Sequence, residues 1–304
     1  MSFTSIVKNE LSKLELNKLE AITFLSAVLK NTAIFENNSI KIITENSSVA
    51  RQVFNLVKEL YGIGPKITLR RGYNYKKNYI YILELKEKVD LIKEDLSLNN
   101  NIPNGFIVDD DNLTRIYLRG VFISSGSVND PKKSRYHLEI IVDTKEYADF
   151  INTKLNSYFL NSKVLKRENK YMIYIKEAEK IGDFLRMMNA ISALLYFEDI
   201  RIYRDHKNMT NRLNNCEQAN VDKIIETASN QVKDIELIES IGGMDLLDEK
   251  TKVAATYRMK YKEASLLELS EIISIETKTP ITKSGLHHRF TKIKEFANKI
   301  RNNK

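Results

Sequence analysis

The pattern of apolar and polar positions repeats itself along the chain at an offset of 93 residues. The alternating stretch YIYILELKEKVDLI, from Tyr79 to Ile92, aligns without a gap with MIYIKEAEKIGDFL, from Met172 to Leu185. At the same offset, LSAVLKNTA aligns with LRGVFISSG, which runs from Leu118 to Gly126. An internal repeat of this length predicts two copies of one structural unit.

Each copy contains the same predicted elements. Alternation of apolar and polar residues near Ile40, Ile80, Leu138 and Ile173 predicts half-buried antiparallel strands. Apolar residues at helical spacing surround them, so each copy is predicted as helix, two strands, helix, two strands, helix. The later helices are expected over residues 47–61 and 86–96, and over 144–159 and 177–188. We therefore expect an α+β pseudo-dimer whose two saddle-like sheets lie side by side and form one concave face.

The pattern changes after Arg204, where the alternating strands stop. Apolar residues at helical spacing predict an amphipathic helix over Asn220 to Glu239, and the IGGMD sequence after it ends that helix. A second helix is predicted over Glu249 to Tyr261. Another opens at Ser265, with Glu268 three residues later, which is the signature of a capping box.

The last predicted helix follows a turn that contains Pro280, which blocks continuation of the preceding helix. It runs from Lys283 to about Arg301, and its predicted buried positions are Leu286, Phe290, Ile293, Ala297 and Ile300. A capped helix, a short turn and a basic helix form the pattern of a helix-turn-helix, here over about Ser265 to Arg301. The predicted DNA contacts are Thr282, Lys283, Ser284, His287, His288, Arg289 and Lys292.

These elements predict a division of the chain into repeats, linkers and a helical domain. The first repeat is expected over 1–98, a linker rich in turn formers over 99–111, and the second repeat over 112–205. A connecting helix over 206–245 and the helix-turn-helix domain over 246–304 complete it.

The charge of the chain is concentrated in that last domain. Of the net charge of +8, the segment from Leu246 to Lys304 contributes +6, from 13 Lys and Arg against 7 Asp and Glu. A basic domain on a nearly neutral body favours double-stranded DNA as its partner. The lone Cys216 excludes an internal disulfide, and with four His the sequence predicts no metal site and no cofactor. No apolar run is long enough for a membrane, so we expect a cytoplasmic, nucleoid-associated protein.

The stretch LRGVFISSG resembles the signature helix of the LAGLIDADG homing endonucleases. In that family each of two paired helices ends in an acid that binds divalent metal. Here the acid positions are Thr32 and Ser125, and hydroxyl groups cannot replace carboxylates as Mg²⁺ ligands. The Asp109 to Asp111 run lies at the start of the second helix, where carboxylates serve as N-caps. The resemblance therefore implies a nuclease-like scaffold that is not an enzyme.

Basic residues on the two repeats have two interpretations. In endonucleases of this fold the face of the sheets binds DNA, which is the first interpretation. Because the two repeats together are nearly neutral, their surface could instead bind another regulatory protein. The residues that could make either contact are Arg70, Arg71, Lys76, Lys77, Lys132, Lys133 and Arg135.

The whole chain resembles the WhiA family of bacterial regulators. The matching stretches are YLRGVFISSGSVNDP, YHLEI, LLYFEDIRIYRD, NRLNNCEQAN and TKSGLHHRFTKIKEFANKIR. The resemblance implies a sequence-specific DNA-binding transcription regulator involved in sporulation, or in cell division and chromosome segregation. Two alternatives remain at this point: an active endonuclease, and a protein-binding scaffold with incidental DNA contact.

Overall fold

The computed structural model describes residues 1–304 except 37, 72–78, 134 and 303–304. They form two compact units, Met1–Arg204 and Asp205–Lys304. Lys76 and Lys77, two of the predicted contact residues, lie outside the described residues.

The first unit contains two repeats and a short helix before them, α1 (Phe3–Leu11). The first repeat consists of α2 (Lys18–Thr32), β1 (Ala33–Glu36), β2 (Ser39–Thr44), α3 (Ser47–Tyr61), β3 (Lys66–Arg71), β4 (Tyr79–Leu85) and α4 (Val89–Asp95). After a 3₁₀ turn, the second consists of α5 (Asp111–Ser125), β5 (Gly126–Val128), β6 (Leu138–Val142), α6 (Lys145–Ser157), β7 (Lys163–Arg167), β8 (Lys170–Ile175) and α7 (Ala178–Met187). The predicted α+β fold with two αββαββα repeats is confirmed.

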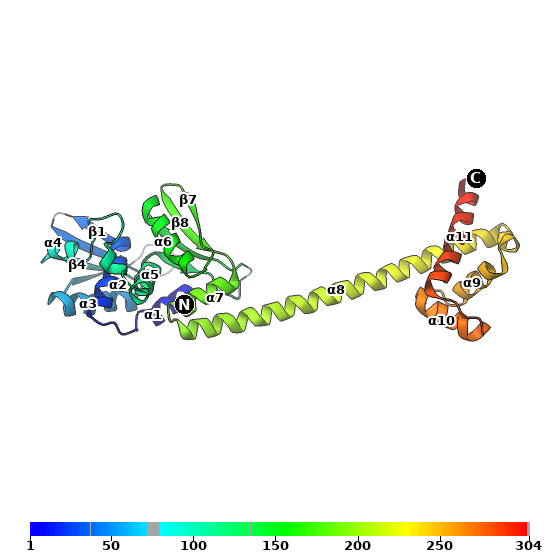
Figure 1. Ribbon diagram of the computed structural model, residues 1–304, viewed down its shortest axis with the longest axis horizontal. Coiled ribbons are helices and arrows are strands. Elements are labelled where there is room, and N and C mark those ends of the chain that lie inside the picture. Colours follow the sequence, from blue (N-terminus) through cyan, green and yellow to red (C-terminus); the bar gives the residue numbers. More distant parts are fainter. Residues whose placement is uncertain (37, 72–78, 134, 303–304) are drawn as a thin grey trace. The chain divides into compact units, whose positions relative to one another are not determined.

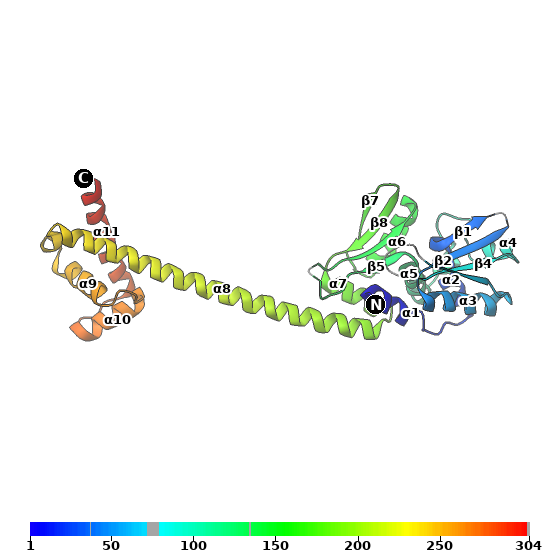
Figure 2. The same ribbon diagram turned by 180° about the vertical axis from the view of Figure 1, so that it is seen from behind.

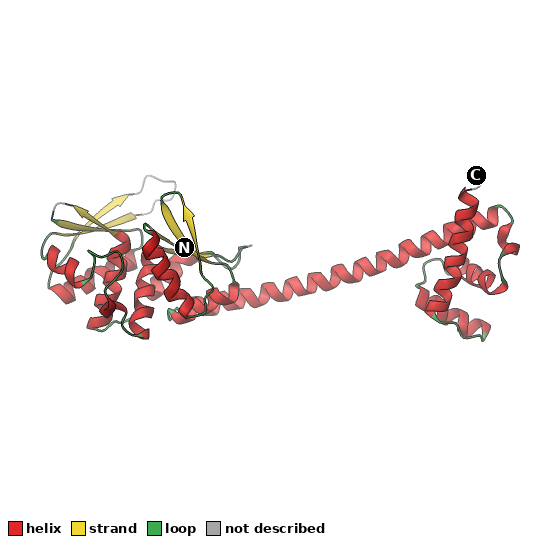
Figure 3. Cartoon of the chain, turned by 45° about the horizontal axis from the view of Figure 1, so that its top comes forward, coloured by secondary structure: helices red, strands yellow, loops and turns green. Residues whose placement is uncertain are grey.

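Each repeat builds one antiparallel sheet of four strands. The strand orders are β1-β2-β4-β3 and β5-β6-β8-β7, so the two sheets have the same topology. Helices cover one side of both sheets and leave the other side open (Figure 3). Side chains alternate between the two faces of a strand, which explains this arrangement. In β2, Ile40 and Ile42 point into the core, whereas Lys41 and Ile43 point to the open side.

Helices α2 and α5 pack against each other between the two sheets (Figures 1 and 2). Both ends of α5 lie 93 positions after those of α2, so the predicted offset holds for this pair. Their closest approach is at Gly120, where an added Cβ would lie 2.7 Å from the Ala27 Cβ and 2.8 Å from the Phe24 carbonyl oxygen. Ala27 and Gly120 are equivalent positions of the repeats, and two small residues there allow the helices to touch.

The gapless alignment of the strands is wrong. Leu85 pairs with Ile40 in the first sheet, and Ile175 pairs with Leu138 in the second, so β4 and β8 correspond at an offset of 90. The sequence alignment matched Ile80 with Ile173, which differs by three positions. An odd shift exchanges the two faces of a strand, because successive side chains alternate. Helix α4 also begins later than expected, at Val89.

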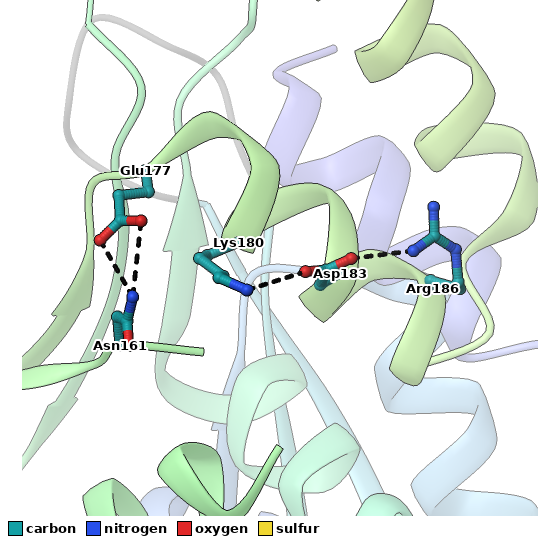
Figure 4. Close-up of polar contacts among 5 residues, drawn as sticks. All are labelled: Asn161, Glu177, Lys180, Asp183 and Arg186. Carbon is teal, nitrogen blue, oxygen red and sulfur yellow. Dashed lines mark hydrogen bonds and ion pairs between the residues drawn. The ribbon is translucent and has the colours of Figure 1, made fainter. Parts of the chain in front are cut away.

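Helix α7 contacts the helix that follows it, α8 (Ile191–Ser240), through a glycine. A Cβ on Gly182 would lie 2.3 Å from the Glu198 carboxylate, so a larger residue there would displace the Glu198 side chain. Helix α7 also carries the ion pairs of Asp183 with Lys180 and Arg186, at 3.4 and 2.8 Å (Figure 4). Exposed pairs of this kind contribute little stability.

Helix α8 begins much earlier than the predicted Asn220. The segment from Ile191 to Ser240 contains neither Gly nor Pro, and Gly242 in the left-handed region follows its end. Its first turn is held by α1, since the Glu10 carboxylate accepts hydrogen bonds from the Ser192 and Ala193 amides at 2.7 and 2.9 Å. The division between the two units falls within this helix.

The second unit is entirely helical within its described residues. After the α8 segment come a 3₁₀ turn, α9 (Glu249–Lys260), α10 (Leu266–Thr277) and α11 (Lys283–Asn302). Its core joins Ile235 and Ile238 of α8 to one side of each later helix. None of the described helices is long and apolar enough to cross a membrane.

Candidate nucleic-acid interface

Helices α10 and α11 are joined by a turn whose ends are fixed by side-chain hydrogen bonds. Ser265 and Glu268 form the predicted capping box at the start of α10. Lys278 adopts a left-handed conformation that ends α10, and the Ile281 amide donates to Ser274 Oγ at 2.9 Å. Thr282 then begins α11 by accepting from the Gly285 amide at 3.1 Å. These contacts set the crossing of the two helices.

One face of α11 is buried in the unit as predicted. Leu286, Phe290, Ile293 and Ala297 are buried in the core, and Ile300 packs partly buried at its end. Contacts of α11 with both α9 and α10 hold this face. The side chains on the opposite face therefore point to solvent.

Four of the predicted contact residues are exposed, and their side chains have no bonded partner among the described residues. Lys283, Ser284, His287 and His288 lie in the first two turns of α11. Within the described residues, none of these side chains makes a hydrogen bond or an ion pair. They add an ammonium, a hydroxyl and two imidazoles to the positive end of a helix, and all of these groups can bind phosphates or base edges.

Two other predicted contact residues are already engaged inside the unit. Arg289 is half-buried and donates to the Lys250 carbonyl at 3.2 Å, and Lys292 forms an ion pair with Asp248 at 3.3 Å. Asp248 also caps α9 by accepting from the Thr251 amide. The hydrogen bonds from Thr251, and then the one from Lys292, lower the pKa of Asp248. Both basic side chains thus hold α11 against the start of α9.

An arginine that the sequence pattern did not reveal packs against the buried face of α11. Arg258 of α9 is fully buried, with its Nε donating to Gln231 Oε1 at 2.9 Å and its Nη1 to the Tyr261 carbonyl at 3.2 Å. Its guanidinium lies 5.4 Å from the centre of the Phe290 ring. Arg258 thereby links α8, the loop after α9, and α11. Because it lies in a polar run, nothing in the sequence distinguishes it from a surface residue.

The two acid positions of the nuclease-like body carry hydroxyls that are turned back onto their own helices. Thr32 Oγ1 donates to the Val28 carbonyl at 2.7 Å, and Ser125 Oγ donates to the Val121 carbonyl at 3.0 Å. In the described parts of the chain, no group of three or more His, Cys, Asp or Glu could hold a metal ion. Of the acidic run before α5, Asp110 is the N-cap, accepting from the Leu113 amide.

The predicted basic contact residues of the body that the structure describes lie on two segments of the chain. Arg70 and Arg71 follow each other on the edge strand β3, so they point to opposite faces of the sheet. Lys132, Lys133 and Arg135 are exposed in the segment between β5 and β6, and Lys132 lies 5.6 Å from the centre of the Tyr196 ring. Apolar residues are also exposed on the sheets, among them Ile43 and Leu165.

Three family models match the chain in order. They describe the WhiA N-terminal LAGLIDADG-like domain over residues 18–99, the WhiA LAGLIDADG-like domain over 114–207, and the WhiA C-terminal HTH domain over 210–297. A relative from Oceanobacillus iheyensis, named "Probable cell division protein WhiA", is 41% identical over 99% of this chain and 98% of its own length. A relative of the same name from Staphylococcus haemolyticus is also 41% identical, with the same coverage.

The chain belongs to the WhiA family. The crystal structure of full-length DUF199/WhiA from Thermatoga maritima is 25% identical over 98% of this chain and 99% of that one, with a TM-score of 0.58. The crystal structure of the N-terminal LAGLIDADG domain of DUF199/WhiA is 24% identical, covers 62% of this chain and 90% of that one, and has a TM-score of 0.50. The predicted family and the predicted LAGLIDADG-like and helix-turn-helix fold are both confirmed.

Proposed function

We propose that this WhiA family member is a sequence-specific DNA-binding regulator without nuclease activity. It binds double-stranded DNA with the helix-turn-helix of α10 and α11, and α11 enters the major groove. The observation that carries the proposal is the first half of α11, where Lys283, Ser284, His287 and His288 are exposed and unpaired within the described residues. A helix that presents such donors beside its positive end has the chemistry of a recognition helix.

The other contacts of α11 divide its predicted residues into two roles. Lys283, Ser284, His287 and His288 read bases or bind phosphates directly. Thr282 begins the helix, while Arg289 and Lys292 hold it against α9. Because Lys292 is also exposed, its charge still adds to the attraction of the surface for DNA.

The absence of nuclease activity is supported by the chemistry at Thr32 and Ser125. A hydroxyl that donates to a carbonyl four residues earlier is neutral, so it does not compensate the charge of a divalent ion. The competing function is a metal-dependent endonuclease. Incubating supercoiled and linear DNA with Mg²⁺ or Mn²⁺ tests it, and site-specific cleavage that chelation abolishes would establish the competing function.

The cellular role proposed here is regulation in cell division and chromosome segregation, or in sporulation. It is supported by the relatives, which are named probable cell division proteins. Such a role places the chain in the cytoplasm, at the nucleoid. The body then serves as a contact for a second regulatory protein, and the exposed Leu165 on its second sheet suits protein better than the polar surface of DNA.

The deciding experiment maps the DNA bound by the full chain across its genome and then measures affinity for the enriched sites. Lys283→Ala should weaken binding about tenfold, because a good base or phosphate contact contributes roughly 1–3 kcal/mol. Lys299→Ala is the matched control, since it removes the same charge from an exposed position near the other end of α11.

The two variants together separate a recognition helix from a generally basic surface. Equal losses for Lys283→Ala and Lys299→Ala would mean that only net charge matters. Unchanged affinity for Lys283→Ala, Ser284→Ala and His288→Ala would remove α11 from the interface.

A further inference from the structure

A cavity of about 1140 Å³ lies where α1 meets both repeats. Its walls are the first turns of α1, the ends of β2 and β4, and the end of α5 with the segment that follows β5. Helix α1 packs against α3 of the first repeat and against α5 and β5 of the second, so the cavity lies within the first unit. Its volume is sufficient for a small organic ligand.

The wall of the cavity contains a cation that lacks a partner. Lys8 of α1 is half-buried, and no acceptor or carboxylate in the described residues lies within bonding distance of its Nζ. Burial lowers the pKa of Lys8 to about 8, although the negative charge of Glu45 acts in the opposite direction. An ammonium withdrawn from water without a partner is costly, and an anion at that position would offset the cost.

The charged side chains that line the cavity balance formally, since Lys8 and Lys133 stand against Glu45 and Asp130. Asp130 already accepts from the Lys132 amide at 2.9 Å and from the Tyr196 hydroxyl at 3.4 Å. Lys133 is a second cation in the wall, and it is exposed. Glu45 is the one other carboxylate among the described residues that line the cavity. Of these four groups, Glu45 and Lys133 are exposed to water and Asp130 has hydrogen-bond donors, whereas Lys8 is half-buried without a bonded partner among the described residues, so an anionic group is favoured beside Lys8.

Apolar side chains form another part of the same wall. Ile43 and Ile80 lie on the open side of the first sheet, because Ile42, one position before Ile43, and Leu83, three positions after Ile80, point into the core. Ile43 is 37% exposed, so a large branched side chain faces the cavity without a packing partner on that side. Covering this surface with an apolar body would be favourable.

We propose that this cavity binds a small organic anion, whose apolar or aromatic body packs on Ile43 and Ile80 while its anionic group pairs with Lys8. This site is separate from α11 and does not depend on DNA binding. The opposite side of α1 holds the first turn of α8 through Glu10, so a bound ligand adds contacts to the helix that anchors α8.

The test is a fluorescence titration of the full chain with 8-anilinonaphthalene-1-sulfonate, which combines an aromatic body with a sulfonate. Lys8→Met should weaken saturable binding about tenfold, because a charge-assisted hydrogen bond is lost. Lys13→Met, on the exposed surface just after α1, is the control that removes the same charge outside the cavity. Ile43→Trp should fill the apolar part of the site and also reduce binding.

A second measurement needs no variant. Pyridoxal 5′-phosphate condenses with a neutral lysine amine with loss of water, and borohydride then reduces the C=N bond so that the label can be mapped by mass spectrometry. We expect Lys8 to be labelled before Lys13, and the sulfonate probe to protect it. Equal labelling of the two lysines, or unchanged probe affinity in Lys8→Met and Ile43→Trp, would overturn the proposal.

Discussion

The ends of the paired helices α2 and α5 and the beginning of α11 all carry polar side chains, but these side chains differ in what they contact. Thr32 and Ser125 donate to carbonyls of their own helices. Ser284 and His288 are exposed and make no side-chain hydrogen bond within the described residues. A hydroxyl bonded within its helix has already used its proton, whereas an unbonded one can donate to a ligand. Residue type alone therefore does not identify a binding site. The hydrogen bonds that a side chain already makes determine whether it can still bind a ligand.

The largest effect expected from this comparison concerns the side chains that pack the buried face of α11 against the core of the second unit. Phe290→Ala removes a buried aromatic ring and the surface on which the Arg258 guanidinium lies. We expect the second unit to lose about 4 kcal/mol of stability and, with it, DNA binding. Urea unfolding measures the first quantity and fluorescence anisotropy the second. Phe106→Ala, at a site that is 49% exposed, is the control and should change neither.

The next largest effect concerns the contact between α2 and α5. Gly120→Leu places a side chain where Ala27 and the Phe24 carbonyl leave no room, so the first unit should lose about 3 kcal/mol. Gly105→Leu is the control, because a Cβ there would meet nothing within 4 Å. If the Gly120→Leu variant melted like the parent, the close approach of the two helices would be refuted.

A smaller effect should follow acidification, which tests the N-cap of α9 at Asp248 and, to a lesser degree, its ion pair with Lys292 of α11. Because its hydrogen bonds lower the pKa of Asp248 in the folded chain, this group stabilises the fold above its ordinary pKa of 3.8. That stabilisation is lost as the pH falls from about 5 through the lowered pKa. Asp248→Asn should flatten the pH dependence of the melting temperature over this range. A parallel fall in the variant would assign the effect to other carboxylates.

The smallest effects are expected at the acid positions themselves. Thr32→Val and Ser125→Ala each remove a hydroxyl that bonds only within its own helix. Stability and DNA affinity should both stay within about 0.5 kcal/mol of the parent chain. A larger loss of DNA affinity in either variant would show that the ends of α2 and α5 still take part in binding.

The sequence was sufficient to predict the features that depend on local spacing. The 93-residue offset located α2 and α5, and the Ser265 capping box located α10. The register of β4 against β8 was not predictable by matching letters. The number of residues between β3 and β4 differs from that between β7 and β8, and a strand with apolar residues on both faces fits either alternation. Ile80 and Ile82 satisfy such a pattern although they lie on the open side of their sheet.

The candidate interface was predictable in part. Helical spacing separated the inner and outer faces of α11, but it could not show that Arg289 and Lys292 contact α9, because the start of α9 lies about forty positions earlier in the chain. The same limit applies to Arg258, whose partners come from three separate segments. The early start of α8 escaped prediction for another reason: its first residues are apolar and resemble a buried core segment rather than the beginning of a long helix.

The contact between Ala27 and Gly120 bears on how a protein of two fused repeats differs from a dimer of one. In a symmetric dimer of the first repeat, the residue opposite Ala27 would be a second Ala27, and the methyl carbons would lie near the 2.7 Å that the glycine avoids. When two copies are fused into one polypeptide, the two equivalent residues that face each other can differ. Here one of them is Gly120, which has no side chain, and the other is Ala27, which has a methyl group. In this chain the asymmetry at the two equivalent positions allows α2 and α5 to touch.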